Sequence, residues 1–176
     1  ISRRTFIKAT ALAVGGLVIA FSIPNAKRFL LPGIPEANAA EGGSKLPTPN
    51  AFLRVGTDNT ITVMLAHSEM GQSIWTTLPM LIAEELDADW SKIKVMHAPA
   101  APEYIHTAYG IQITGGSSTT WSEFDRYRQA GALTRALLVN AAAEKLGVAV
   151  ESIKTENGFA ISGDKKISYG DLAEAA

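Results

Sequence analysis

The sequence contains no cysteine, and this absence excludes several kinds of chemistry. Without thiols the chain forms no disulfide, holds no iron–sulfur cluster and offers no cysteine nucleophile or thiolate metal ligand. Histidine is also scarce, because only His67, His97 and His106 are present. No two of them have the spacing of a helical zinc site. We therefore expect no metal to be bound by this chain's own side chains.

An excess of charge of either sign is also missing. Lys and Arg number 16, Asp and Glu number 17, and the net charge is −1. Nucleic acid is not an expected partner, since its phosphates call for a basic face. The serines lack a G-x-S-x-G context, so a hydrolase triad is not expected. Apolar residues make up 47% of the 176, enough for a buried core, and the length suits one ordinary domain plus a tail or two small units.

Residues 1–31 differ in kind from the rest of the chain. Arg3, Arg4 and Lys8 precede an apolar run at 9–23, which is shorter than the roughly 20 residues of a membrane span. The arginine pair, followed by Phe6, is similar to a twin-arginine (Tat) export signal. An ordinary Sec signal or an anchor helix are the alternatives. We expect a hydrophobic helix here, retained as a membrane anchor.

Two further expectations concern processing and length. The segment "ANAA" at 37–40 offers an A-x-A cleavage site, so loss of the signal stays an alternative to the anchor. The sequence begins without Met and stops within a helix-like pattern. We expect it to be part of a longer polypeptide.

The remaining residues predict a linker followed by a folded unit. Residues 32–50 are rich in Pro, Gly, Ala and Ser, which is typical of a linker. The expected elements within 51–176 are a hairpin turning at 56–59, a helix at 74–86, a strand at 92–98, a helix at 118–146, and hairpin turns at Asn157-Gly158 and Gly163-Asp164. The order β-β-α-β-α-β-β-(β)-α favours an α+β fold, with a mixed sheet and helices on one side.

The stretch "EMGQS" (69–73) lies directly before the first helix. Gly71 allows close backbone approach, and the first N–H groups of a helix have no partner within it, so they suit an anion. The Gln72 amide both donates and accepts hydrogen bonds. The alternative is a plain helix start, with Ser73 as the N-cap and nothing bound.

A second stretch, "QITGGSSTT" (112–120), repeats this arrangement before the second helix. Gly115, Gly116 and Ser117 form another backbone-amide cradle, and the alternative is a flexible loop in which Ser118 or Thr119 is the N-cap. Two such loops in one small domain predict that both converge on one ligand.

Other conspicuous residues are expected to be structural. The three histidines are dispersed along the chain, so we interpret them as surface or core residues. Trp75, Trp90 and Trp121 are expected to pack. Glu84 and Glu85 are interpreted as a solvated face or one side of an interhelix salt bridge.

The ordered motifs resemble one family. They are "EMGQSIWTTLPMLIAEELDADWSKIKV", "TGGSS", "RQAGALTRALLVNAAAEKLGV" and "YGDLAEAA". Residues 50–176 look like the N-terminal part of the molybdopterin-binding large subunit of the xanthine dehydrogenase/aldehyde oxidase family. The branch they resemble contains the isoquinoline 1-oxidoreductase-like and membrane-bound aldehyde dehydrogenase subunits. The resemblance makes 51–176 the first part of a larger molybdopterin-binding domain.

The resemblance implies a cofactor and the residues that contact it. The cofactor is molybdopterin cytosine dinucleotide, with molybdenum. A Met-Gly-Gln-Gly loop of the family contacts it, which assigns Gly71 and Gln72, while Ser73 stands where the family usually has Gly. The Thr-Gly-Gly-Ser loop assigns Gly115, Gly116 and Ser117. The general base of the family is a Glu in a Gly-rich motif near the C-terminus of the full subunit. No such motif occurs here, so neither Glu69 nor any other residue is assigned a catalytic role.

The resemblance also implies an activity and partners. It implies oxidation of aldehydes to carboxylic acids with oxygen taken from water. Electrons would leave through a small subunit with [2Fe–2S] clusters and a c-type cytochrome subunit with haem c, to the quinone pool. The expected location is the periplasmic side of the bacterial inner membrane after Tat export. An N-heterocycle hydroxylase of the same family is an alternative, as is a short membrane-tethered binding module without catalysis.

Overall fold

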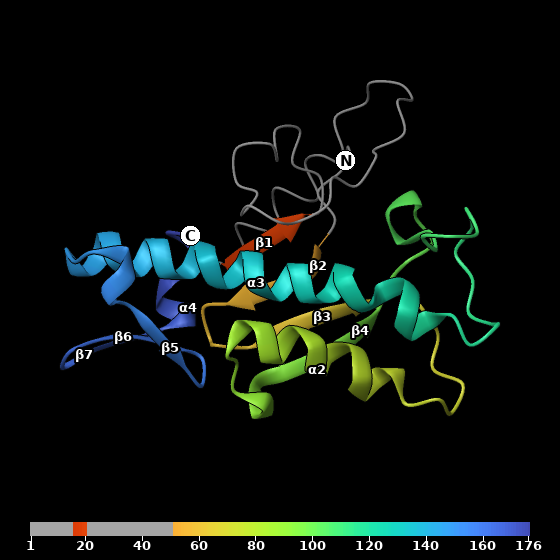
Figure 1. Ribbon diagram of the computed structural model, residues 1–176, viewed down its shortest axis with the longest axis horizontal. Helices are drawn as coiled ribbons and strands as arrows, with labels where there is room; N and C mark the ends of the chain where they lie inside the picture. Colours follow the sequence, from red (N-terminus) through yellow and green to blue (C-terminus); the bar gives the residue numbers. More distant parts are fainter. Residues whose placement is uncertain (1–15, 21–50) are drawn as a thin grey trace, which may run out of the picture.

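The computed structural model describes residues 16–20 and 51–176. Within them the chain forms two small sheets and two longer helices, which confirms the expected α+β class (Figure 1). The main hydrophobic core lies between the larger sheet and the helices, where Leu53, Val63, Leu78 and Leu138 are each 0% exposed. The predicted order of elements from residue 51 onward is also confirmed.

The larger sheet contains four strands in the order β1-β2-β3-β4. Strands β1 (Gly16–Ala20), β2 (Ala51–Gly56) and β3 (Ile61–Leu65) pair antiparallel, and β3 pairs parallel with β4 (Ile93–His97). The sheet is therefore mixed, as expected. Alternate residues of β3 are buried, which matches its apolar–polar alternation. Asp58 orders the β2–β3 turn by accepting a hydrogen bond from the N–H of Thr60 at 2.9 Å.

Strand β1 differs from the expectation for the N-terminal segment. Residues 16–20 were expected within a hydrophobic helix, but they pair with β2 in a register that sets Leu17 opposite Val55. The other residues of 1–31 and the linker at 32–50 lie outside the described residues. Among the helices that the structure describes, none has the length and apolar character needed to cross a bilayer.

Helices α2 (Ile74–Leu86) and α3 (Thr119–Leu146) lie together in front of the larger sheet in Figure 1. Their observed limits confirm the predicted helices, and Pro79 lies inside α2. The helices cross closely at Gly131, where an added Cβ would stand 2.7 Å from the carbonyl oxygen of Ile82. Arg128 donates to Glu85 at 2.6 Å, so the expected interhelix salt bridge is also confirmed.

The C-terminal part forms a second sheet of three antiparallel strands, β5 (Lys154–Glu156), β6 (Phe159–Ser162) and β7 (Lys165–Ser168). Asn157 and Gly158 have φ of 53° and 78°, as a type I′ turn requires. The short helix α4 (Tyr169–Leu172) follows. Single 3₁₀ turns elsewhere in the described part of the chain are η2 (Trp90–Lys92), η3 (Pro102–Tyr104) and η4 (Val150–Ser152). This sheet and the loops that precede α2 and α3 lie at opposite ends of the molecule (Figure 1).

Candidate functional site

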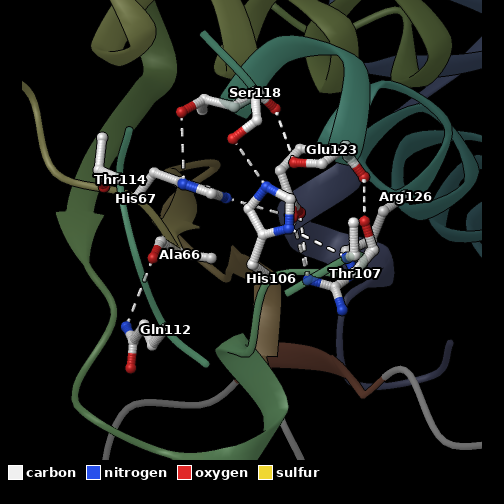
Figure 2. Close-up of polar contacts among 12 residues, drawn as sticks. Ala66, His67, His106, Thr107, Gln112, Thr114, Ser118, Glu123 and Arg126 are labelled. Carbon is white, nitrogen blue, oxygen red and sulfur yellow. Dashed lines mark hydrogen bonds and ion pairs between the residues drawn. The ribbon is translucent and has the colours of Figure 1, made fainter. Parts of the chain in front are cut away.

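The two sequence-predicted loops meet at one end of the molecule. We call residues 67–73 the first loop and residues 98–118 the second loop. The N–H of Ser68 donates to Oγ1 of Thr114 at 2.8 Å, which joins the two loops directly. The side-chain amide of Gln112 also donates to the carbonyl of Ala66, at 3.4 Å (Figure 2). The structure thus brings together segments that are 46 residues apart in the sequence.

Glu69 occupies the N-terminal end of α2. Its carboxylate accepts hydrogen bonds from the N–H groups of Gly71 at 2.8 Å, Ser73 at 2.9 Å and Trp75 at 3.1 Å. The bond from Trp75, followed by those from Ser73 and Gly71, lowers the pKa of Glu69, although burial acts in the opposite direction. The expectation that these N–H groups are unpaired is therefore wrong at α2.

Gln72 is engaged within its own loop. Its side-chain amide donates to the carbonyl of Ser68 at 2.8 Å and accepts from the N–H of Met70 at 2.5 Å. Because both ends of the amide are used, Gln72 stabilises the loop in this conformation. A role for Gln72 toward a ligand requires it to exchange at least one of these bonds.

Ser73 stands at the N-cap position of α2, but its side chain makes no capping hydrogen bond. Its backbone has φ 64° and ψ 27°, in the left-handed region that favours glycine. This conformation gives a physical reason for the glycine that the family usually has at this position. At the start of α2 the carboxylate of Glu69, and not the side chain of Ser73, accepts from the N–H groups of Ser73 and Trp75.

The second loop leads into a helix whose first backbone donors are open. Gly116 and Ser117 have φ of 61° and 52°, and Ser118 turns back to donate from Oγ to the carbonyl of Gly115 at 2.7 Å. Ser118 is therefore no side-chain cap of α3. Within the described residues, the N–H groups of Thr119 and Thr120 have no hydrogen-bond acceptor. The start of α3 therefore offers more free donors than that of α2, where the N–H of Trp75 donates to Glu69 and that of Thr76 to the Ser73 carbonyl.

The glycines of both loops border open space. A Cβ added at Gly71 or at Gly115 would meet no atom within 4 Å, whereas one at Gly116 would stand 3.4 Å from the hydroxyl of Tyr109. Gly71 and Gly116 have positive φ, but Gly115 does not. Neither backbone conformation nor packing among the described residues therefore explains glycine at position 115.

A buried polar cluster lies beneath the two loops, and sequence reasoning did not identify it. Its members are His67, His106, Ser118, Thr119 and Glu123, with the partly exposed Arg126 at its edge. Figure 2 labels all of them except Thr119. His67 and His106 are each 1% exposed and their ring centroids are 5.4 Å apart, whereas His97 is at the surface. Interpreting the histidines as core or surface residues was correct, but their dispersal along the sequence hid this contact.

Two of these contacts involve the carboxylate of Glu123. His67 Nε2 lies 3.3 Å from Oε1 of Glu123, and Arg126 Nη1 lies 3.1 Å from Oε2. The side chain of Glu123 is 0% exposed. Burying a carboxylate is costly unless it is paired and hydrogen-bonded, and here both oxygens have a partner.

The three tryptophans do not pack as expected among the described residues. Trp75, Trp90 and Trp121 are 41%, 48% and 59% exposed. Trp75 makes an edge contact with the ring of His97, at 4.9 Å between centroids, and Trp121 makes one with His106, at 5.7 Å. Other large apolar side chains of the loops, including Met70 at 66% and Ile111 at 55%, are exposed as well.

The fold and the two adjoining loops define an α+β domain that presents helix-start donors and open glycines at one end, an arrangement suited to a polar or anionic ligand. The family model described as molybdopterin cofactor-binding domain matches residues 30–176. The chain belongs to this family. The resemblance inferred from the sequence motifs is thereby confirmed.

Relatives and solved structures agree with this assignment. The chain is 33% identical over 175 residues to a protein of Gluconacetobacter polyoxogenes named membrane-bound aldehyde dehydrogenase [pyrroloquinoline-quinone], covering 98% of this chain and 21% of that protein. It is 36% identical over 129 residues to the isoquinoline 1-oxidoreductase subunit beta of Brevundimonas diminuta, covering 71% of this chain and 16% of that subunit. The chain thus spans about a fifth of the length of these curated relatives.

The fold is also found in two solved oxidoreductases. Quinoline 2-oxidoreductase from Pseudomonas putida 86 matches with a TM-score of 0.53 and 19% identity, and the Cu,Mo-CO dehydrogenase matches with a TM-score of 0.55 and 21% identity. Each match covers 70% of this chain and 15% of the other. At these identities the likeness establishes the fold.

Proposed function

We propose that this chain is part of the large subunit of a molybdenum hydroxylase that oxidises aldehydes to carboxylic acids with oxygen from water. The observation that carries the proposal is the meeting of the two loops through Ser68 and Thr114, each loop leading into a helix of a molybdopterin-binding domain. The name of the relative that covers nearly the whole chain, an aldehyde dehydrogenase, supports aldehydes as the substrate class.

The residues present fit a molybdopterin cofactor, with different roles for the two loops. Free N–H groups at Thr119 and Thr120 and the open space beside Gly115 suit an anionic group approaching the start of α3. Gly115, Gly116 and Ser117 would therefore provide the main backbone cradle. When bound, the cofactor supplies the two-electron redox chemistry of the reaction.

The first loop would contribute less through its N–H groups, because Glu69 already accepts those of Gly71 and Ser73. The loop would contact the cofactor through the exposed backbone at Gly71 and, after exchanging one of its loop bonds, through the Gln72 amide. Ser73 places a side chain where a glycine would leave the backbone bare. Glu69 has no proposed part in proton transfer, since its carboxylate is fully engaged in capping α2.

The wider setting is also proposed. The cofactor form would be molybdopterin cytosine dinucleotide, and electrons would pass through a small subunit with [2Fe–2S] clusters and a c-type cytochrome subunit with haem c to the quinone pool. Tat export would place the complex on the periplasmic side of the inner membrane. The twin-arginine-like start and the membrane-bound relative support this setting.

A second substrate class has its own support. The beta subunit of isoquinoline 1-oxidoreductase is 36% identical over 129 residues, which favours N-heterocycle hydroxylation as the alternative. The name of the aldehyde dehydrogenase relative includes a different cofactor, pyrroloquinoline quinone. The test of the proposed function therefore includes the identity of the bound cofactor.

The test is to purify the full-length protein with its partner subunits and determine molybdenum, pterin and pyrroloquinoline quinone per chain. Reduction of an artificial electron acceptor is then measured with an aldehyde and with isoquinoline. Molybdenum and pterin together with aldehyde turnover would support the proposal. Turnover of isoquinoline alone would favour the heterocycle alternative. A complex without molybdenum and without either activity would favour a non-catalytic module.

A further inference from the structure

The buried cluster beneath the loops carries a desolvation cost in free energy. Glu123 is fully buried as a carboxylate, and replacing such ion pairs by apolar residues is often neutral or stabilising in other proteins. Net stability therefore gives no sufficient reason for a charge at this position. A specific arrangement of the surrounding segments is the better-attested use of a buried charge.

Donors and acceptors in the cluster define one arrangement of its protons. The N–H of Ala108 donates to His106 Nδ1 at 3.0 Å, so a neutral His106 carries its proton on Nε2. His106 then donates to Ser118 Oγ at 2.8 Å, and Ser118 donates to the carbonyl of Gly115 at 2.7 Å. This chain of bonds connects the interior to the backbone of the Gly-Gly turn.

A second chain of bonds starts from Glu123. An ionised carboxylate only accepts, so His67 Nε2 donates to Glu123, and in a neutral His67 Nδ1 is left to accept from Thr119 Oγ1 at 3.3 Å. His67 is followed directly by Ser68, whose N–H donates to Thr114 Oγ1. The bonds from Glu123 therefore reach the first turn of α3 and the start of the first loop.

One chain of bonds ends at Gly115, next to Thr114, and the other passes through His67, next to Ser68. Both therefore lie beside the Ser68–Thr114 bond that joins the two loops. We propose that Glu123 and His67, with His106 and Ser118, are positioning residues that hold the two loops in the register needed to bind the cofactor. The inference rests on the proposed function for the cofactor's part. Each of the four acts through its bonds to the backbone and side chains of residues 67–69 and 114–119.

Two matched pairs of variants test this inference in the full-length protein. Thr119→Val removes the hydroxyl that His67 accepts from and conserves the volume, while Thr119→Ser keeps a hydroxyl. Glu123→Gln removes the buried charge, while Glu144→Gln makes the same change at an exposed position on the same helix.

The main readout is amide hydrogen exchange of peptides spanning 67–75 and 107–119. Thr119→Val and Glu123→Gln should raise exchange in both peptides roughly tenfold, because the first loses a buried hydrogen bond and the second the buried charge that strengthens the bonds to His67 and Arg126. Thr119→Ser and Glu144→Gln should leave it near the wild-type rate. A second readout, ¹⁵N chemical shifts of His67 under selective histidine labelling, should show the Nε2–H tautomer in the wild type; the opposite tautomer would contradict the arrangement of bonds from Glu123.

The outcomes separate this inference from the proposed function. Faster loop exchange together with lower molybdenum and pterin content in Thr119→Val and Glu123→Gln, but not in their partners, supports the positioning role. Unchanged loop exchange overturns it, whatever the metal content. If Glu123→Gln fails to fold, the Thr119 pair decides. A wild-type protein without molybdenum would refute the proposed function, and the exchange data would still decide whether the cluster holds the loops.

Discussion

The carboxylate of Glu69 accepts a hydrogen bond from the N–H of Trp75 at 3.1 Å, and through this and two shorter bonds it caps α2. Glu69 thereby takes the position that an external anion was expected to occupy at this helix. The start of α3 has no such internal carboxylate among the described residues. The two loops look alike in sequence and differ in this one physical respect.

Replacing Glu69 should loosen the first loop and weaken α2. Glu69→Ala removes the acceptor for three backbone N–H groups, so we expect the melting temperature to fall by roughly 2–4 °C. Glu84→Ala, at an exposed position of the same helix, is the matched control and should change it little. Equal melting temperatures for both variants would show that Glu69 does not stabilise the helix.

The contribution of Glu69 should depend on pH in a defined direction. Its pKa is lowered from the ordinary value of 4.5, chiefly by the hydrogen bond from Trp75. A lowered pKa means that the stabilisation is complete above 4.5 and is lost as pH falls through the folded-state pKa. The difference in melting temperature between wild type and Glu69→Ala should therefore be constant above about pH 5.5 and shrink at lower pH. A difference that disappears already at pH 5 would contradict the sign of this shift.

Ser73→Gly should stabilise the domain. The left-handed backbone of Ser73, with φ 64°, costs a residue with a side chain more than it costs glycine, and the serine hydroxyl makes no capping bond in return. After allowing for the greater freedom of glycine in the unfolded chain, we expect a gain of about 0.5 kcal/mol in the free energy of unfolding, measured in urea. Loss of stability would show that the serine side chain has a contact in the full protein that compensates the strain.

Gly131→Ala should destabilise the packing of α2 against α3. The added methyl would stand 2.7 Å from the Ile82 carbonyl oxygen and 2.9 Å from Cβ of Glu85, so the helices must separate. Overpacking of this kind costs about 1–3 kcal/mol and outweighs the gain of roughly 1 kcal/mol in helix propensity. Urea unfolding measures the balance, and a stabilised variant would show that the helices move apart at little cost.

Features set by residues close together in the sequence could be predicted, whereas contacts between residues far apart in the sequence could not. Helix 74–86 and the Asn157-Gly158 turn follow from local periodicity and turn chemistry, and both were predicted. His67 and Glu123 are 56 residues apart, so no local sequence pattern predicts their contact. The capping by Glu69 was hidden for another reason: a residue four positions before the N-cap needs a particular loop conformation to reach the helix start.

Two further differences between sequence and structure have a similar origin. Residues 16–20 are apolar enough for a helix, but their pairing with β2 is a property of the sheet. The exposure of Trp121 at 59% could not be predicted from residue type, because tryptophan is more often buried. For the candidate site, the sequence located both loops but did not distinguish the loop with free donors from the loop that is capped internally.

The most direct test of the account is the cofactor content of Gly115→Ala in the full-length protein. A Cβ at 115 would meet no described atom within 4 Å and the backbone needs no positive φ, so the melting temperature of the cofactor-free protein should not change. If the second loop holds the cofactor as proposed, molybdenum and pterin per chain should fall several-fold, because the methyl group enters the cofactor's space. Wild-type molybdenum and pterin content in this variant, with wild-type stability, would contradict the central claim.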